Sequence, residues 1–275
     1  MNIAITTVDR SPRRNFVEQT LASMLAKDQT VERYAPIRII TDGEDMNFLG
    51  PWKTDRRLVI ETTDKKPHAR TFDGIRPRVV MANVRAMQAV PHGGSLLLLE
   101  DDLVFAPRWL ERTERIIERI RADIGSTRFM LALYTPFELT SEDRVQFEFA
   151  EREGYCACIR PTYYGSQAIY YGAEALQTVL GDMKQLGLVE GRLGSDEVVP
   201  YTSVNRDVPL LAAVPSLVQH VGADSTWLAP GSVPMHQSPT FRDEDEVRPS
   251  DGQPERVPEP PGGASLTDVL ERLGP

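Results

Sequence analysis

The sequence predicts an α/β domain with a mostly parallel central sheet flanked by helices. Short β-rich segments alternate with longer segments of helical apolar spacing, which is typical of parallel strands joined by right-handed crossovers. One expected strand, at 96–99, consists of four leucines, and continuous apolar strands are typical of sheets buried on both faces. The chain has 275 residues, of which 41% are hydrophobic and 26% are charged, as in ordinary globular proteins.

The first half of the chain begins with a β-rich strand at residues 2–8. Residues 15–27 carry apolar side chains at helical spacing, and residues 76–90 repeat this pattern directly before the leucine strand. Two short β-rich segments, at 37–40 and 58–61, lie between these two helices. Each of these strands is therefore separated from the next by a connection long enough for a crossover.

The second half of the chain continues the alternation less regularly. Residues 109–124 predict a helix whose exposed side alternates between arginine and glutamate. The other expected elements are strands at 129–134, 162–171 and 209–214, helices at 173–187 and 195–201, and an acidic surface loop at 140–153.

A single folded domain is expected over residues 1–240, followed by a flexible tail at 241–275. The tail is rich in proline, glycine and acids, and residues 242–263 have too few apolar side chains to form a core. Residues 265–273 have the pattern of a short docking helix, with a frayed terminus as the alternative.

Composition excludes several classes of function. The net charge of −9 and the lack of a clustered basic stripe argue against a nucleic-acid partner. No apolar run approaches the length of a membrane span, so no integral membrane segment is expected. Cys156 and Cys158 are interpreted as small buried hydrophobes in a reducing compartment. Together with an amino terminus that lacks a basic signal-peptide region, this predicts a cytoplasmic location.

Three acids, Glu100, Asp101 and Asp102, directly follow the leucine strand. They would lie at its carboxyl end, where open α/β sheets bind their ligands. Clustered carboxylates repel one another and usually share a cation, and oxygen ligands favour Mg²⁺ or Mn²⁺ bridging substrate phosphates. The alternative is that Asp102 caps a helix that starts near Pro107.

Three later segments contain further candidates for a functional site. Gly165 interrupts an aromatic strand, either to let a ligand approach or as a bulge without function. Asp196 and Glu197 stand at a helix start, where capping is the alternative to catalysis. His220 follows apolar residues and is either a ligand or a core histidine with satisfied hydrogen bonds.

The order of these segments resembles that of GT-A-fold glycosyltransferases, most closely the N-acetylglucosaminyltransferase-IV family. The resemblance rests on LLLEDDL at 97–103 and PSLVQHVGADST at 215–226, and it spans roughly residues 2–225. It implies a single GT-A (Rossmann-like) domain. The sequence lacks the membrane anchor and stem of that family, which leads us to expect a soluble bacterial relative. It departs from the family after Gly222, where Ala223-Asp224 replaces a typical Thr-His.

The resemblance also implies a role for each candidate residue. Asp102 and His220 would hold Mn²⁺ or Mg²⁺, and Asp196 would be the catalytic base with Glu197 in reserve. The remaining expected contacts, to the nucleotide-sugar donor or the waters of the metal, are Thr6, Thr7, Arg10, Asp42, Asn83, Arg85, Glu100, Asp101, Gly165 and Ser166.

These roles describe a metal-dependent, inverting glycosyltransferase of the hexosyltransferase class. It would move a sugar from a nucleotide-sugar, with a UDP-sugar favoured, to a hydroxyl of a glycan, natural product or peptide. The cation would stabilise the leaving diphosphate, and the base would take the proton of the acceptor. One alternative is a nucleotidyl- or phosphotransferase, which would need a glycine-rich phosphate loop that TTVDRSPRR at 6–14 lacks. Another is a nucleotide-sugar-binding module without catalysis.

Overall fold

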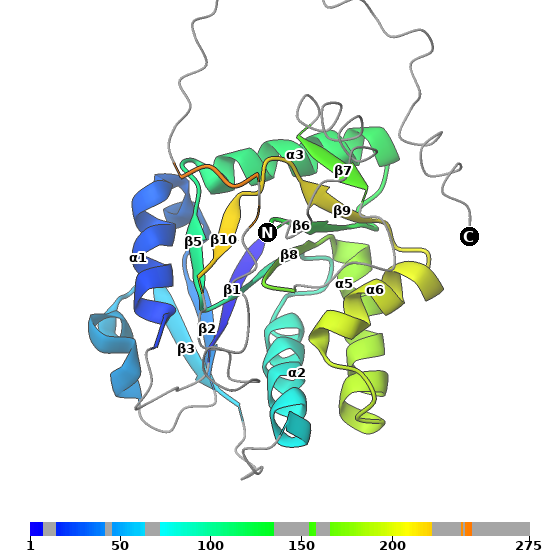
Figure 1. Ribbon diagram of the computed structural model, residues 1–275, viewed down its shortest axis with the longest axis horizontal. Coiled ribbons are helices and arrows are strands. Elements are labelled where there is room, and N and C mark those ends of the chain that lie inside the picture. The colour runs from blue at the N-terminus through cyan, green and yellow to red at the C-terminus, as the bar shows by residue number, and fades with distance from the viewer. Residues whose placement is uncertain are drawn as a thin grey trace, which may run out of the picture.

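The computed structural model has three layers, with one large sheet between two groups of helices (Figure 1). Its eight strands are arranged in the order β3-β2-β1-β4-β8-β6-β9-β7. The residues that the structure describes are 1–7, 15–41, 46–63, 72–134, 154–157, 166–221, 238 and 240–243.

The first half of the sheet is parallel, as the sequence predicts. β1 (Asn2–Thr7) pairs in parallel with β2 (Ile37–Thr41) on one side and with β4 (Leu96–Glu100) on the other. β2 pairs in parallel with β3 (Leu58–Thr62) at the edge. The leucine run is therefore an interior strand that ends at Glu100.

The second half of the sheet is mixed. β8 (Ala168–Tyr171) lies antiparallel between β4 and β6 (Met130–Ala132). β9 (Leu210–Ala213) is parallel to β6, and β7 (Tyr155–Ala157) closes this edge antiparallel to β9. Within the large sheet four of the seven described pairings are parallel, but β8 runs antiparallel beside β4, the strand that ends in the acids.

Successive side chains of each strand pack into two separate cores, one on each face of the sheet. Ile3, Ile5, Leu97 and Leu99 belong to the core on one face, whereas Ala4, Leu96 and Leu98 belong to the core on the other. A strand covered on both faces has no polar side, since successive side chains point to opposite faces. This explains why the leucine run has no polar alternation.

Two different sets of helices cover the two faces of the sheet. α1 (Val17–Lys27) and α3 (Trp109–Ile124) pack on the first face. α2 (Phe72–Gln88), α5 (Ala173–Asp182) and α6 (Ser195–Asn205) pack on the second. The expected helix at 173–187 changes type within its length, because α5 ends at Asp182 and a π-helix, η3 (Met183–Val189), continues it. Two short 3₁₀ segments, η1 (Gln29–Tyr34) and η2 (Met46–Thr54), were not predicted.

A second, two-stranded sheet lies beside α1. β5 (Leu103–Phe105) pairs antiparallel with β10 (Val218–His220), so that His220 faces Leu103. The sequence prediction ended the strands at 214 and missed both of these short strands.

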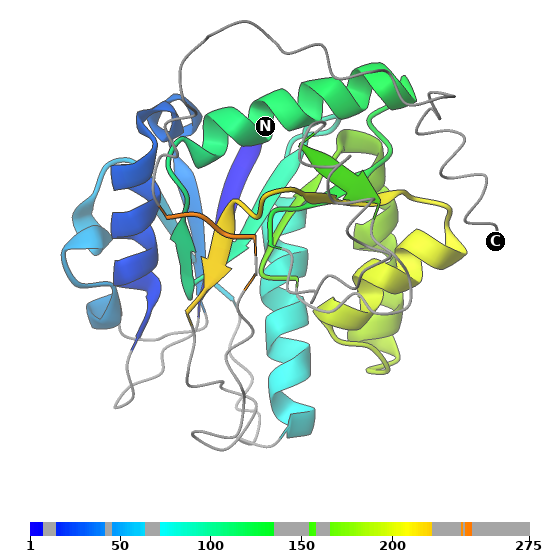
Figure 2. The ribbon, with the colours of Figure 1, turned by 45° about the horizontal axis from the view of Figure 1, so that its top comes forward.

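One face of α1 follows the chain that leaves β4. Thr20 contacts Asp101 and Leu103, and Ser23 Oγ accepts the Phe105 amide at 3.0 Å. Farther along the helix, the Met24 carbonyl oxygen accepts a hydrogen bond from the Trp109 indole. The Lys27 carbonyl oxygen accepts one from the Arg108 amide. Because these positions are three or four apart, they share one side of the helix. Figure 2 shows the amino-terminal end of α3 beside α1.

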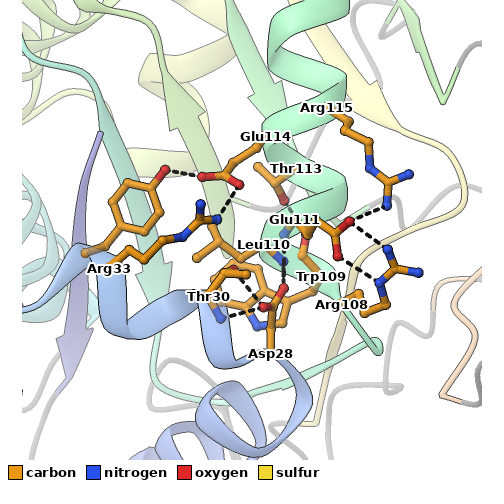
Figure 3. A network of polar contacts seen from close by, with 11 residues as sticks. Asp28, Thr30, Arg33, Arg108, Trp109, Leu110, Glu111, Thr113, Glu114 and Arg115 are labelled. Atoms are coloured by element: carbon orange, nitrogen blue, oxygen red, sulfur yellow. Dashed lines mark hydrogen bonds and ion pairs between the residues drawn. The ribbon is translucent and has the colours of Figure 1, made fainter.

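Asp28, directly after α1, caps the amino terminus of α3. Its Oδ2 accepts the amides of Leu110 and Glu111 at 2.9 and 3.0 Å (Figure 3). The alternative in which Asp102 caps this helix is therefore wrong, since another acid has that role and comes from a different part of the chain.

Within the described residues, no helix is long and apolar enough to cross a membrane. The expected acidic loop, the tail beyond 243 and Cys158 lie outside the described residues.

Candidate active site

The acids after β4 diverge at a bend between β4 and β5. Glu100 is half-buried, while Asp101 and Asp102 are buried. The Asp101 carboxylate accepts a hydrogen bond from the hydroxyl of Thr7, at the end of β1. The Asp102 carboxylate instead lies beside His220, with 3.1 Å between Oδ2 and Nε2. The three neighbouring acids therefore have different surroundings.

His220 reaches Asp102 because the two short strands pair in register. The Val221 amide donates to the Asp102 carbonyl oxygen at 2.9 Å, directly after the pairing of His220 with Leu103. The imidazole also lies near the Tyr134 ring, with 6.4 Å between ring centroids. Backbone pairing thus fixes the approach of the two side chains.

Asp102 and His220 are compatible with a hard divalent cation. Among the described residues no third His, Cys, Asp or Glu completes a metal-binding group. Mg²⁺ and Mn²⁺ sites that act on phosphates commonly use one or two protein ligands and fill the remaining positions with water and phosphate oxygens. A pair of protein ligands at the end of a strand fits that type of site.

Asp196 lies at the start of α6, next to the end of β4. Its Oδ1 accepts hydrogen bonds from the Ser166 amide at 2.7 Å and from the Ser166 hydroxyl at 2.6 Å. The next residue, Gln167, accepts the Glu100 amide at 2.7 Å through its carbonyl oxygen. The antiparallel strand β8 therefore brings Asp196 to the edge of the sheet that carries the acids.

Glu197 is a capping residue in this structure. Its Oε2 accepts the Gly194 amide at 2.7 Å, as the glutamate of a capping box does. Both acids are exposed, but they have different partners: Asp196 accepts hydrogen bonds from Ser166, which precedes β8, and Glu197 accepts one from the start of its own helix.

The candidates from α2 point in other directions. Asn83 is buried, and its Nδ2 donates to Ser195 Oγ at 2.8 Å, so it connects α2 to the start of α6. Arg85 is paired with Glu61, with 3.1 Å between Nε and Oε2. The structure brings Asn83 to the helix of Asp196 and places Arg85 beside β3.

The remaining candidates have mixed outcomes. Thr6 and Thr7 are buried at the end of β1, and Thr6 Oγ1 lies 3.5 Å from the Leu99 carbonyl oxygen. Arg10, Asp42 and Gly165 lie outside the described residues.

Two buried residues with a connection to these acids, Thr20 and Tyr171, were missed by the sequence prediction. Thr20 contacts the backbone on both sides of Asp102. Tyr171 is fully buried; burial first, and then the negative charges of Asp196 and Glu100, raise the pKa of its phenol. For Thr20 a signal existed, because it is a polar residue within the apolar stripe of α1.

No protein-family model and no curated protein matches the sequence. Among solved structures, GalNAc-T7 with UDP, GalNAc and Mn²⁺ is similar at a TM-score of 0.54 and 12% identity, over 83% of this chain and 46% of that one. A 4-diphosphocytidyl-2C-methyl-D-erythritol synthase from Anaerococcus prevotii gives a TM-score of 0.46 at 12% identity, over 78% and 88% of the two chains. The mannosyltransferase PcManGT from Pyrobaculum calidifontis with GDP-Man and Mn²⁺ gives 0.42 at 10% identity, over 78% and 56%.

The similarity to GalNAc-T7 confirms the expected fold: the chain has a GT-A fold, with one large sheet between helices. This chain spans less than half of GalNAc-T7. The narrower resemblance to the N-acetylglucosaminyltransferase-IV family stays a prediction.

Proposed function

We propose that this protein is a metal-dependent glycosyltransferase that transfers a sugar from a nucleotide-sugar to an acceptor hydroxyl. The observation that carries this proposal is the 3.1 Å approach of Asp102 to His220 at the edge of the sheet that also holds Asp196. A carboxylate, an imidazole and a second, exposed carboxylate supply two metal ligands and one base.

Asp102 and His220 are the proposed ligands of Mn²⁺ or Mg²⁺. A bound divalent cation supplies Lewis-acid stabilisation of the negative charge that develops on the leaving diphosphate. The net charge of −9 supports a cation at this position, since an anionic protein otherwise repels an anionic donor. Asp101 and Glu100, which precede Asp102 in the chain, are proposed to orient the donor.

Asp196 is the proposed general base. One of its oxygens is fixed by Ser166, and its Oδ2 makes no hydrogen bond with another described residue. A carboxylate held by one oxygen presents the other in a defined direction, which suits proton abstraction from a bound hydroxyl. A single base opposite the leaving group produces inversion at the anomeric carbon, so we propose an inverting enzyme.

The finer assignments follow the sequence resemblance. They are membership of the N-acetylglucosaminyltransferase-IV family, transfer of a hexosyl group, a UDP-sugar as donor and a cytoplasmic location. The acceptor is proposed to be a glycan, natural product or peptide.

A thermal-unfolding screen tests the proposal directly. UDP-, GDP- and TDP-sugars are added to the protein with Mn²⁺ or with a chelator. We expect a UDP-sugar near 100 times its Kd to raise Tm by about 5 °C with Mn²⁺ and to have no effect with chelator. Asp102→Asn should abolish this rise. Asp182→Asn should keep it, because Asp182 is a buried acid that instead binds Arg206 and Thr202.

Product analysis separates the proposed activity from the nearest alternative. A glycosyltransferase releases a nucleoside diphosphate from the nucleotide-sugar. A nucleotidyltransferase instead joins a sugar phosphate to the α-phosphate of a nucleoside triphosphate, and the triphosphate releases pyrophosphate. The proposal is overturned if no nucleotide-sugar shifts Tm with Mn²⁺, or if pyrophosphate is the product.

A further inference from the structure

We infer that Thr20 of α1 is a positioning residue for Asp102, holding the bend from which this side chain meets His220. The inference rests on the proposed function, in which these two side chains are metal ligands. Thr20 lies on a helix, whereas Asp102 lies between β4 and β5 and His220 lies in β10, and the Thr20 hydroxyl binds the backbone beside Asp102 rather than either ligand side chain.

The hydroxyl of Thr20 bridges the backbone on both sides of Asp102. It lies 2.6 Å from the Asp101 carbonyl oxygen, to which it can donate, and it accepts the Leu103 amide at 3.0 Å. The Leu103 carbonyl oxygen is also 3.0 Å away. One side chain therefore contacts the peptide groups before and after the proposed ligand.

Thr20 is a polar residue at a position of α1 that is otherwise occupied by apolar side chains. Thr20 is fully buried, and its neighbours on the same face of α1 are the apolar residues Val17, Leu21 and Met24. A buried hydroxyl is unfavourable unless it is hydrogen-bonded, and valine has nearly the same shape. The bonds to the bend supply a reason for a hydroxyl here.

Two further contacts continue the bridge toward both sides of the site. The Thr7 hydroxyl binds the Asp101 carboxylate, so both the backbone and the side chain of Asp101 are held. The Asp102 carbonyl oxygen accepts the Val221 amide at 2.9 Å, next to His220. Movement of the bend would therefore change the approach of Asp102 to His220.

Contacts that orient metal ligands typically change metal affinity by 10- to 100-fold when they are lost. Thr20 is expected to act in this way, since it fixes the backbone of the ligand rather than the metal itself.

The test compares Thr20→Val with Thr20→Ser and with the matched control Thr113→Val. Thr113 is also a fully buried threonine, but its hydroxyl binds the Trp109 carbonyl oxygen at 2.8 Å within α3. Mn²⁺ affinity is measured by calorimetry, and the exchange of the Val221 amide is measured by NMR without metal.

We expect Thr20→Val to weaken Mn²⁺ binding about 10- to 100-fold and to accelerate exchange at Val221. Thr20→Ser should restore both, and Thr113→Val should change Mn²⁺ affinity less than about twofold, because its hydroxyl contacts only its own helix. Equal Mn²⁺ affinity in Thr20→Val and the wild type would overturn the inference.

The exchange measurement tests the positioning role of Thr20 separately from the proposed metal-dependent function. If the wild type binds no Mn²⁺, the proposed function fails, and the exchange rate alone decides whether Thr20 holds the bend. Unchanged exchange at Val221 in Thr20→Val would then refute the positioning role.

Discussion

Oδ2 of Asp102 lies 3.1 Å from Nε2 of His220, although Asp102 follows the large sheet and His220 ends a strand of the small one. The register of β5 with β10 produces this approach. Two side chains that share one cation act as a unit, and the loss of either removes most of the effect of both.

Asp102→Asn and His220→Asn should therefore be strongly non-additive. Each single variant is expected to lower Mn²⁺ affinity about 100-fold, and the double variant should be little worse than the weaker single one. Calorimetry of the four proteins gives the coupling free energy. Additive losses of Mn²⁺ affinity would mean that the two side chains do not bind the same cation.

The two acids at the start of α6 should respond differently to amide substitution. Asp196→Asn keeps an oxygen that can accept the Ser166 bonds but cannot take a proton, so kcat should fall about 100- to 10,000-fold with little change in donor affinity. Glu197→Gln keeps the capping bond to Gly194 and should leave kcat within a few-fold of wild type.

Steady-state transfer kinetics and donor-binding titrations on both variants check this prediction. If Glu197→Gln lost turnover while Asp196→Asn kept it, the base and the cap would have to be exchanged.

Local sequence patterns were enough to predict single helices and strands whose apolar spacing is regular. The helix at 109–124 was predicted with its observed bounds, and the acids were placed correctly at the end of the leucine strand. The antiparallel insertion of β8 could not be predicted, since pairing partners depend on contacts far apart in the chain. β5 and β10 were missed because each is only three residues long and neither lies in a six-residue apolar run like the one at 129–134 that contains β6.

The same distinction applies to the candidate site. Residue type made Asp102 a candidate metal ligand but left capping open for Asp196 and a core role open for His220, and it was the family resemblance that assigned all three a role. The roles of Thr20 and Asp28 arise from hydrogen bonds to residues more than 80 positions away, which no local pattern records.

Two glycines at opposite ends of α5 should have opposite effects on stability when replaced by alanine. A Cβ at Gly172 would lie 2.0 Å from the Thr127 carbonyl oxygen, so Gly172→Ala forces backbone apart and should cost about 3 kcal/mol. A Cβ at Gly181 meets nothing within 4 Å, and this exposed helical position should gain about 0.5 to 1 kcal/mol from alanine.

Urea denaturation of the two variants measures both free energies of unfolding. Equal and small effects at the two positions would contradict the close packing of Gly172 against the segment before β6.

Asp28 should be among the acids whose removal most destabilises the fold. Besides the two α3 amides, its Oδ1 accepts the Thr30 amide at 2.8 Å and the Thr30 hydroxyl at 2.6 Å. Asp28→Ala leaves the buried Leu110 amide and the half-buried Glu111 amide without this acceptor and should cost about 2 to 3 kcal/mol at pH 7. Asp55→Ala is the matched control: Asp55 also binds the amide two residues on, but it caps no other helix, and its loss should cost about 1 kcal/mol or less.

The contribution of Asp28 should also depend on pH. Burial by itself raises the pKa of its carboxyl, but hydrogen bonds from Thr30, Glu111 and Leu110 outweigh burial and hold the pKa below its usual value. A lowered pKa in the folded state stabilises the protein above the pKa of the unfolded chain, near 3.9, and this stabilisation is lost as the pH falls further. The difference in unfolding free energy between wild type and Asp28→Ala should therefore be constant from about pH 7 to 5 and shrink below about pH 4. A difference that stayed the same down to pH 3 would show that the charge of Asp28 does not stabilise α3.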